Sequence, residues 1–252
     1  HRAHCIVMRT IKLVIQFDGT RYHGWQTQAG DRTVQKTLEE ALSRILNRPV
    51  KIYGAGRTDA GVHAFGQAAH FKTDSPMDLA RLKKALNSIL PPDIVIVNLS
   101  EVDSAFHARY SARSRAYRYL IWNSPDRLPF LCAYAWHIPH RLDLAAMRSA
   151  ARHLIGTHDF SSFQASDRKR VNPVRTVLAI RLTKRFRHLI VFEIRANAFL
   201  KHMVRNIVGT LVSVGSGRMT VDEFRRVFEK RDRTAAGMTA PAHGLFLKGV
   251  EY

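Results

Sequence analysis

The order of the apolar segments along the chain is the feature that most constrains its fold. In the first half, strands are predicted over residues 11–17, 50–53, 67–72 and 94–99, and amphipathic helices over residues 33–46 and 78–90. Thr33 is the expected N-cap of the first helix, and Pro91 and Pro92 follow the second, where proline ends helices. The order strand-helix-strand-strand-helix-strand is that of a ferredoxin-like unit.

The second half repeats this order loosely. Strands are predicted over residues 112–122, 174–182, 188–196 and 245–250, and helices over residues 142–155, 199–214 and 221–230. We therefore expect an α+β protein made of two ferredoxin-like halves, residues 8–104 and 105–252, with their sheets joined around a basic central cleft.

Charge indicates the class of partner. The chain of 252 residues holds 40 Lys and Arg against 20 Asp and Glu, a net charge of +20, and its hydrophobic content of 46% is that of a folded protein. Such an excess, spread over both halves, is typical of nucleic-acid binders. The alternative is a solvated basic surface without a partner.

Little in the sequence indicates export or a membrane. Cys5 and Cys132 are the only cysteines, too few for a disulfide framework and not spaced as zinc ligands. No apolar run approaches the ~20 residues of a membrane helix. The first seven residues are too short and polar for a signal peptide, and Met8 is a candidate natural start. We expect a cytoplasmic protein with no membrane contact.

A glycine-rich loop at residues 54–64 contains a single carboxylate, Asp59, two residues after Arg57. A dinucleotide-binding turn would need glycine at position 59 and a following helix, and here a strand is predicted to follow. Although His63 and His70 lie nearby in the sequence, no metal-ligand spacing is present, so no metal is expected. A glycosidase normally needs two carboxylates, and this loop supplies one.

One carboxylate beside an arginine fits another task. The arginine would favour the ionised form of Asp59, which could then act as a nucleophile or base at a sugar carbon. An ordinary loop salt bridge between Arg57 and Asp59 explains the pair equally well at this point.

Two further segments place basic and aromatic residues together. On the strand predicted over residues 112–122, alternation puts Arg113, Arg115, Tyr117 and Tyr119 on one face, which suits phosphate contact beside base stacking. On the helix predicted over residues 199–214, basic side chains share a face that is either a phosphate-binding or simply a solvated surface: Lys201, His202 and Arg205.

Residues 54–63 (GAGRTDAGVH) closely resemble the signature of the tRNA pseudouridine synthase A family. Similarity extends over nearly the whole chain from Met8 and includes residues 17–26, 106–109, 117–119, 197–209 and 241–245. One departure is Phe246, where a tyrosine is frequent.

The resemblance implies an isomerase that converts uridine to pseudouridine at positions 38, 39 and 40 of the tRNA anticodon stem-loop. It implies no cofactor or metal, and a homodimer with the tRNA lying across both subunits. Site residues follow from the same motifs. They are Asp59 as the catalytic aspartate, Tyr117 stacking on the target base, Arg57 flipping the nucleotide, Arg205 as the basic partner of the aspartate, and Leu245 packing near the base.

Two rival functions need different residues. A non-catalytic tRNA-binding module would keep the charge and the Arg/Tyr face, but it has no use for Asp59. A hydrolase of small nucleosides would not need a net charge of +20.

Overall fold

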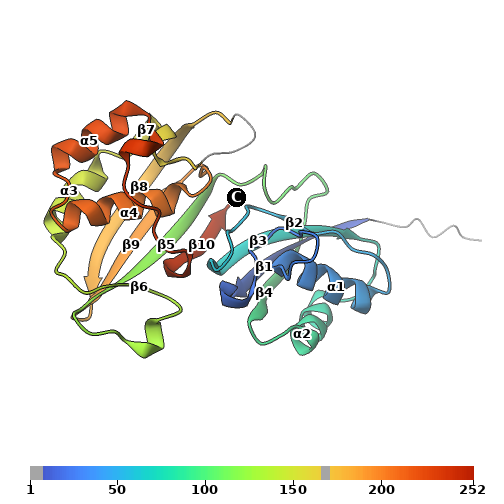
Figure 1. Ribbon diagram of the computed structural model, residues 1–252. Helices are drawn as coiled ribbons and strands as arrows, with labels where there is room; N and C mark the ends of the chain where they lie inside the picture. Colours follow the sequence, from blue (N-terminus) through green and yellow to red (C-terminus); the bar gives the residue numbers. More distant parts are fainter. Residues whose placement is uncertain (1–7, 166–170) are drawn as a thin grey trace, which may run out of the picture. The chain divides into compact units, whose positions relative to one another are not determined.

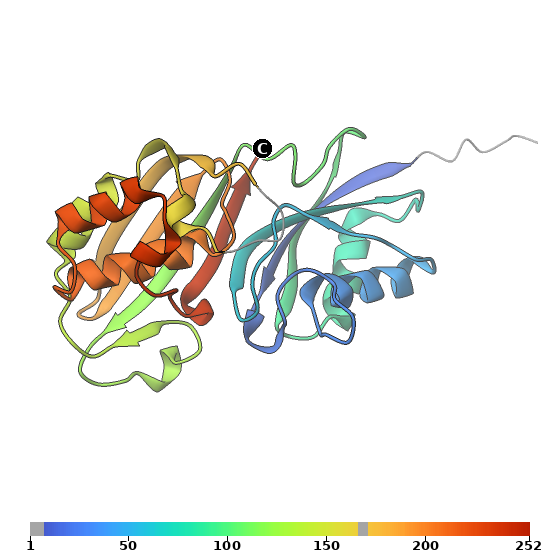
Figure 2. The ribbon, with the colours of Figure 1, turned by 45° about the horizontal axis from the view of Figure 1, so that its top comes forward.

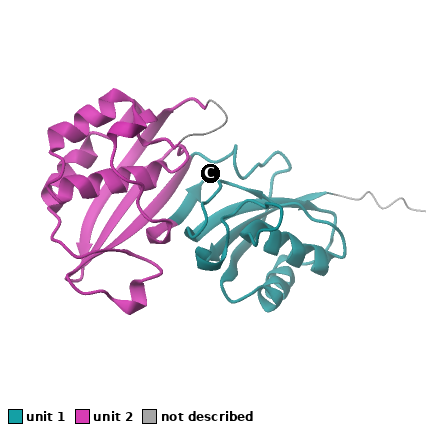
Figure 3. Cartoon of the chain, viewed as in Figure 1, with its two compact units in different colours: residues 1–113, 247–252 teal, residues 114–246 magenta. Residues whose placement is uncertain are grey.

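The computed structural model describes residues 8–165 and 171–252, so Cys5 lies outside the described residues. The chain divides into two compact units, residues 1–113 with 247–252 (unit 1) and residues 114–246 (unit 2), coloured separately in Figure 3. Both combine helices with strands, so the fold class is α+β. Among the described residues, no helix is both long enough and apolar enough to cross a membrane.

Unit 1 is an antiparallel sheet with two helices. Its strands are β1 (Arg9–Phe17), β2 (Tyr53–Gly54), β3 (His63–Thr73) and β4 (Ile94–Val102), and its helices are α1 (Val34–Leu46) and α2 (Leu79–Ile89). The strand order is β4-β1-β3, with β2 paired to β3 at Tyr53 and Gly54. Both helices lie on one face of this sheet (Figures 1 and 2).

Local capping fixes where these helices begin. The Thr33 hydroxyl accepts a hydrogen bond from the Lys36 N–H, and the Asp78 carboxylate accepts one from the Arg81 N–H. The apolar stripe of α1 then packs Leu38 and Leu42 at 0% exposure into the core. Of the strand predicted over residues 50–53, only Tyr53 lies in a strand, and β2 extends one residue further, to Gly54, into the glycine-rich loop.

Unit 2 combines further strands with three helices. Its strands are β5 (Ser114–Asn123), β6 (Trp136–Ile138), β7 (Gly156–Asp159), β8 (Val174–Arg185) and β9 (Leu189–Ala196). Its helices are α3 (Leu144–Arg152), α4 (Met203–Gly215) and α5 (Val221–Lys230). The order is β5-β9-β8-β7, and β6 pairs with β5 in parallel. The last strand, β10 (Leu245–Glu251), begins with the final residues of unit 2 and continues in unit 1.

Helix α4 forms the centre of unit 2, because it is buried along nearly its whole length. The prediction that this helix starts at residue 199 is wrong. His202 adopts a left-handed conformation with φ 58°, so the helix begins at Met203, and Lys201 and His202 precede it in a turn. These two side chains therefore do not share a helix face with Arg205.

Candidate active site

The glycine-rich loop connects β2 to β3 and exposes its polar residues unequally. Arg57 is exposed, Thr58 is buried, and Asp59 is half-buried. The Val62 N–H donates to the Asp59 carbonyl at 3.1 Å, which closes a turn over Gly61 at φ 77°. A partly buried carboxylate is thus held at the tip of a short, hydrogen-bonded turn.

A segment distant in sequence, residues 19–25, supports the loop through backbone contacts. The Trp25 N–H donates to the Thr58 carbonyl at 3.1 Å, and the Gly61 N–H donates to the Tyr22 carbonyl at 3.3 Å. Gly24 has φ 81°, and a Cβ there would lie 2.5 Å from the Thr58 oxygen. Only glycine permits this approach, because it tolerates the left-handed conformation and has no side chain to clash.

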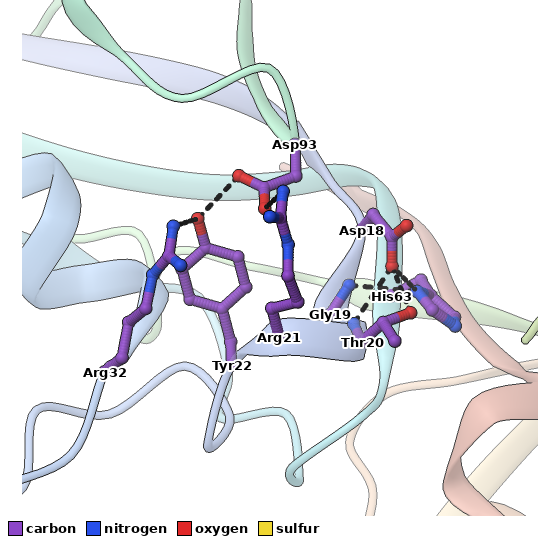
Figure 4. Close-up of polar contacts among 8 residues, drawn as sticks. All are labelled: Asp18, Gly19, Thr20, Arg21, Tyr22, Arg32, His63 and Asp93. Atoms are coloured by element: carbon purple, nitrogen blue, oxygen red, sulfur yellow. Dashed lines mark hydrogen bonds and ion pairs between the residues drawn. The ribbon is translucent and has the colours of Figure 1, made fainter.

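Gly19 makes a second close approach to the end of the loop. A Cβ at Gly19 would lie 1.9 Å from the Val62 oxygen, and the Gly19 N–H donates to Nδ1 of His63 at 2.9 Å (Figure 4). Accepting this bond leaves Nδ1 without a proton, which assigns the proton of a neutral ring to Nε2. The nearby Asp18 carboxylate, 3.1 Å from Nδ1, instead accepts from the N–H and hydroxyl of Thr20.

The strand side of the loop is fixed as well. The Gln67 amide donates to the Gly56 carbonyl at 2.9 Å, and the Ala55 N–H donates to the Ala68 carbonyl at 2.8 Å. The Trp25 ring packs on Gly54, where a Cβ would lie 2.5 Å from its Nε1. Hydrogen bonds therefore fix the backbone on both sides of Asp59.

A polar network anchors the supporting segment to the rest of unit 1 (Figure 4). The buried Tyr22 hydroxyl lies 2.7 Å from Asp93 and accepts from Arg32 at 3.2 Å, while Arg21 pairs with the other oxygen of Asp93 at 2.7 Å. Burial, then the hydrogen bond to Asp93 and its charge, raise the pKa of Tyr22 to about 12. The phenol therefore stays protonated and keeps donating to Asp93.

Arg57 and Asp59 form no ion pair with each other among the described residues, and Arg57 extends into solvent. The loop salt bridge that explained the pair equally well in the sequence is therefore not what the structure has.

Tyr117 lies on β5 in unit 2, half-buried. Its ring meets Phe199 edge-on, with centroids 5.0 Å apart and an interplanar angle of 85°. Tyr119, two residues further on the same strand face, is fully buried, and its hydroxyl donates to the Pro241 carbonyl at 2.7 Å. Burial raises the pKa of Tyr119. The proposed stacking face therefore does not include Tyr119, which belongs to the core.

Arg205 and Tyr119 both donate hydrogen bonds to the segment that leads to Leu245. The Arg205 guanidinium donates to the Ala240 carbonyl at 2.8 Å, and the Ala240 N–H donates to the Arg205 carbonyl at 3.1 Å. The chain then passes through a short turn, Ala242–Gly244, to Leu245, which is 6% exposed. A Cβ at Gly244 would lie 2.6 Å from the Tyr119 ring. Unit 2 thus gathers Arg205 and Leu245 around one hydrogen-bonded segment.

The remaining predicted ligand-binding residues are dispersed. Arg113 is exposed and belongs to unit 1, where its N–H donates to the Glu251 carbonyl at 2.8 Å. Arg115 donates to the Asn197 carbonyl at 2.9 Å. Lys201 is exposed in the turn before α4, and His202 is half-buried there.

Sequence reasoning missed the residues that support the site. Gly19, Gly24 and Trp25 hold the Asp59 loop, and Phe199 holds the Tyr117 ring. Residues 17–26 were singled out only by the family resemblance, and their contacts with a loop about forty residues away could not be inferred from spacing. Across residues 8–165 and 171–252, no three His, Cys, Asp or Glu side chains are grouped so that they could hold a metal ion.

Comparison with known proteins identifies the family. A family model described as tRNA pseudouridine synthase matches residues 13–111 and 150–252, which include Asp59, Arg205 and Leu245. tRNA pseudouridine synthase A of Thermoanaerobacter pseudethanolicus is 45% identical over 245 residues, covering 97% of this chain and 100% of the relative. The protein of the same name from Acetivibrio thermocellus is 46% identical with the same coverage.

Among solved structures, the archaeal box H/ACA sRNP Nop10-Cbf5 complex aligns with 87% of this chain and 60% of its own at 12% identity. Its TM-score of 0.37 is too low to support any conclusion. The sequence comparisons are sufficient by themselves, because both the family model and relatives of full length agree. The chain belongs to the tRNA pseudouridine synthase family, and it is an isomerase that acts on uridine in tRNA.

Proposed function

We propose that this enzyme converts uridine to pseudouridine at positions 38, 39 and 40 of the tRNA anticodon stem-loop, with Asp59 as its single catalytic carboxylate. The observation that supports Asp59 is the construction of its loop, where backbone hydrogen bonds at Thr58, Gly61 and Val62 fix a half-buried carboxylate. The target positions rest on the resemblance of residues 54–63 to the family signature.

The proposed chemistry needs one carboxylate. Anionic Asp59 either attacks C1′ of the ribose or takes the proton from C2′, and the bond between C1′ and N1 breaks. The uracil rotates, C5 forms the new bond to C1′, C5 loses its proton to a base, and N1 gains one. Because the base is never released, no second acid has to protonate a departing group. The isomerisation involves no net redox change, and we propose no cofactor or metal.

Access to C1′ requires that the nucleotide leave the stem, at a cost of a few kcal/mol of unstacking. We propose that exposed Arg57 enters or braces the vacated position. Tyr117 would stack on the target base and assist removal of the C5 proton, with its ring orientation held by Phe199. Leu245 would give the base an apolar contact, and Arg205 would serve as the basic partner of the carboxylate.

The remaining basic residues would contact phosphates, which position the RNA without reading its sequence. They are Arg113, Arg115, Lys201 and His202, and the net charge of +20 provides the long-range attraction. Their separation along the chain fits an extended ligand better than a nucleoside.

Three broader proposals accompany this function. Both halves are ferredoxin-like, for which the β4-β1-β3 order with β2 on β3 gives support in unit 1. The protein acts in the cytoplasm as a homodimer that shares one tRNA across two subunits. A monomer by sedimentation at concentrations that saturate tRNA binding would contradict the homodimer, and activity confined to a membrane fraction would contradict the location.

The test of the function uses the purified chain and unmodified tRNA carrying tritium at C5 of uridine. Bond formation at C5 releases that tritium into water, so release measures turnover directly. Replacing U38, U39 and U40 by cytidine should abolish release, and tRNA from cells lacking this protein should lack pseudouridine there. Release that continued from the substituted tRNA would contradict the assigned positions.

A further inference from the structure

Four rings form an aromatic ladder on unit 1, made of Tyr53, His70, His107 and Tyr110. The centroids of Tyr53 and His70 are 5.3 Å apart in a stacked geometry, those of His70 and His107 are 4.7 Å apart, and those of His107 and Tyr110 are 4.4 Å apart. The ladder includes His107, which belongs to the segment at residues 106–109 that resembles the family and has no role in the proposed chemistry.

The two ends of the ladder face solvent. Tyr53 is 50% exposed and Tyr110 is 76% exposed, whereas His70 between them is 3% exposed. Tyrosine rings normally bury their apolar faces, and contiguous exposed aromatic surface marks a binding site more often than chance. The rings of Tyr53 and Tyr110 are therefore accessible to a ligand, while His70 between them is buried.

The segment that presents Tyr110 is rigid. The Ala108 N–H donates to Nδ1 of His70 at 3.1 Å, and the Ala108 carbonyl accepts from the Tyr252 hydroxyl at 2.9 Å. The Ser111 N–H donates to the His107 carbonyl at 2.8 Å, and the Ser111 hydroxyl accepts from the His107 N–H at 3.0 Å. A ring held in this way loses little conformational entropy when a ligand stacks on it.

The charges around the ladder are positive. The Arg109 guanidinium lies 5.8 Å from the centroid of the Tyr110 ring. Lys72 follows His70 by two residues on β3, so both lie on the same strand face, and the charge of Lys72 acts on the His70 ring. Rings beside cations suit a ligand that has both flat π-faces and phosphates, which describes single-stranded nucleic acid.

We propose that the aromatic ladder binds an unpaired nucleobase of the tRNA substrate, stacked on Tyr110, with Arg109 beside the adjoining phosphate. This inference rests on the proposed function, because it takes tRNA as the ligand. Tyr53 connects the ladder to catalysis, since it begins β2 and the Asp59 loop follows directly from that strand. A nucleotide held at the ladder would thus be positioned by the same rigid element that positions Asp59.

The test compares Tyr110→Ala with Tyr110→Phe, which keeps the ring. Stacking on an aromatic side chain contributes ~1–3 kcal/mol per base, so Tyr110→Ala should weaken the tRNA Kd by about 5- to 100-fold. Tyr110→Phe should bind within about twofold of the wild type, and kcat at saturating tRNA should change by less than about twofold in both variants. Because Tyr110 is 76% exposed, both variants should retain the wild-type unfolding midpoint.

A matched control and a salt titration separate stacking from general effects. Phe186 is 90% exposed in the turn between β8 and β9, and Phe186→Ala should leave the tRNA Kd unchanged. Tyr110→Ala should leave the slope of log Kd against log salt unchanged. Arg109→Gln should reduce that slope by about one ion, because it removes one phosphate contact.

A tRNA Kd for Tyr110→Ala within twofold of the wild type would overturn the inference. If the monomer–dimer equilibrium measured by sedimentation changed in that same variant, the ladder would be assigned to a protein partner instead. Failure of the proposed function itself looks different, because the wild-type enzyme would then release no tritium from U38–U40 whatever the Kd of the variants.

Discussion

The Gly19 N–H donates a hydrogen bond to Nδ1 of His63 at 2.9 Å, and this contact joins two motifs that are far apart in the sequence. Gly19 belongs to the segment that supports the Asp59 loop, and His63 is the residue at which the loop enters β3. The position of Asp59, the carboxylate that we propose to be catalytic, therefore depends on residues to which we assign no chemical role.

Gly19→Ala tests this dependence. The added Cβ would lie 1.9 Å from the Val62 oxygen, so the backbone must move. We expect the free energy of unfolding to fall by about 1–3 kcal/mol and turnover to fall with it. Urea unfolding and tritium release measure the two effects. Gly249→Ala, where a Cβ would meet nothing within 4 Å, is the control, and an equal loss in both variants would contradict the steric explanation.

His70 gives unit 1 a pH-dependent stability. Burial first, then the charges of His107 and Lys72, lower the pKa of His70 to about 4, from an ordinary value near 6.5. Between these values the unfolded chain binds more protons, so this contribution is complete above pH ~6.5 and is lost as the pH falls toward ~4. From pH 7 to pH 5 we expect the wild type to lose about 1–2 kcal/mol more than His70→Gln, measured by urea unfolding. Parallel losses in the two proteins would contradict the prediction.

Asn206 supports the segment that contacts Arg205. Its side-chain oxygen accepts from Thr239 at 2.6 Å and from Arg233 at 3.1 Å, and its amide donates to the Phe163 carbonyl at 2.8 Å. Asn206 itself is 0% exposed. Asn206→Leu would remove these three hydrogen bonds and should lower the free energy of unfolding by about 2–4 kcal/mol. Ser216→Ala, at the half-exposed end of α4, should cost less than about 1 kcal/mol. Comparable midpoints in thermal unfolding would show that the network does not stabilise unit 2.

Substitutions of Tyr117 can distinguish a role in the chemical step from a role in substrate binding. Tyr117→Ala should lower kcat far more than it raises KM, because stacking and C5 deprotonation matter in the transition state. Tyr117→Phe should retain the edge-on contact with Phe199 and lose only the contribution of the hydroxyl. Steady-state kinetics on tRNA measure both variants. A loss confined to KM would make Tyr117 a residue that only tethers the substrate.

Local features of the fold were predictable from the sequence. Thr33 and Asp78 are the N-caps of α1 and α2, and the two helices begin within one residue of the predicted positions. Such starts can be predicted because capping depends on only a few neighbouring residues. The start of α4 was not predictable, since no local sequence signal marks the left-handed conformation of His202, and the apolar periodicity continues back to residue 199. Strands β6 and β7 have only 3 and 4 residues, too few for the alternation of apolar and polar side chains to reveal them.

In the candidate site, too, some residues could be identified from the sequence and others could not. Asp59 was identifiable as a candidate because it is the single carboxylate of a glycine-rich loop, and Tyr117 because of its place on a strand. Alternation put Tyr119 on the same face as Tyr117, but it cannot distinguish a ligand-facing ring from one covered by the segment at Pro241. The support of the Asp59 loop by Gly24 and Trp25 depends on tertiary contact, which the sequence pattern does not encode locally.

The central claim is that Asp59 performs the chemistry, and single-turnover tritium release with Asp59→Asn tests it most directly. The amide keeps the size of the side chain but is a far weaker nucleophile and base, so we predict no release from U38–U40. The tRNA Kd should stay within about tenfold of the wild type, because phosphate contacts elsewhere dominate binding. Release by Asp59→Asn at a rate near that of the wild type would contradict the account.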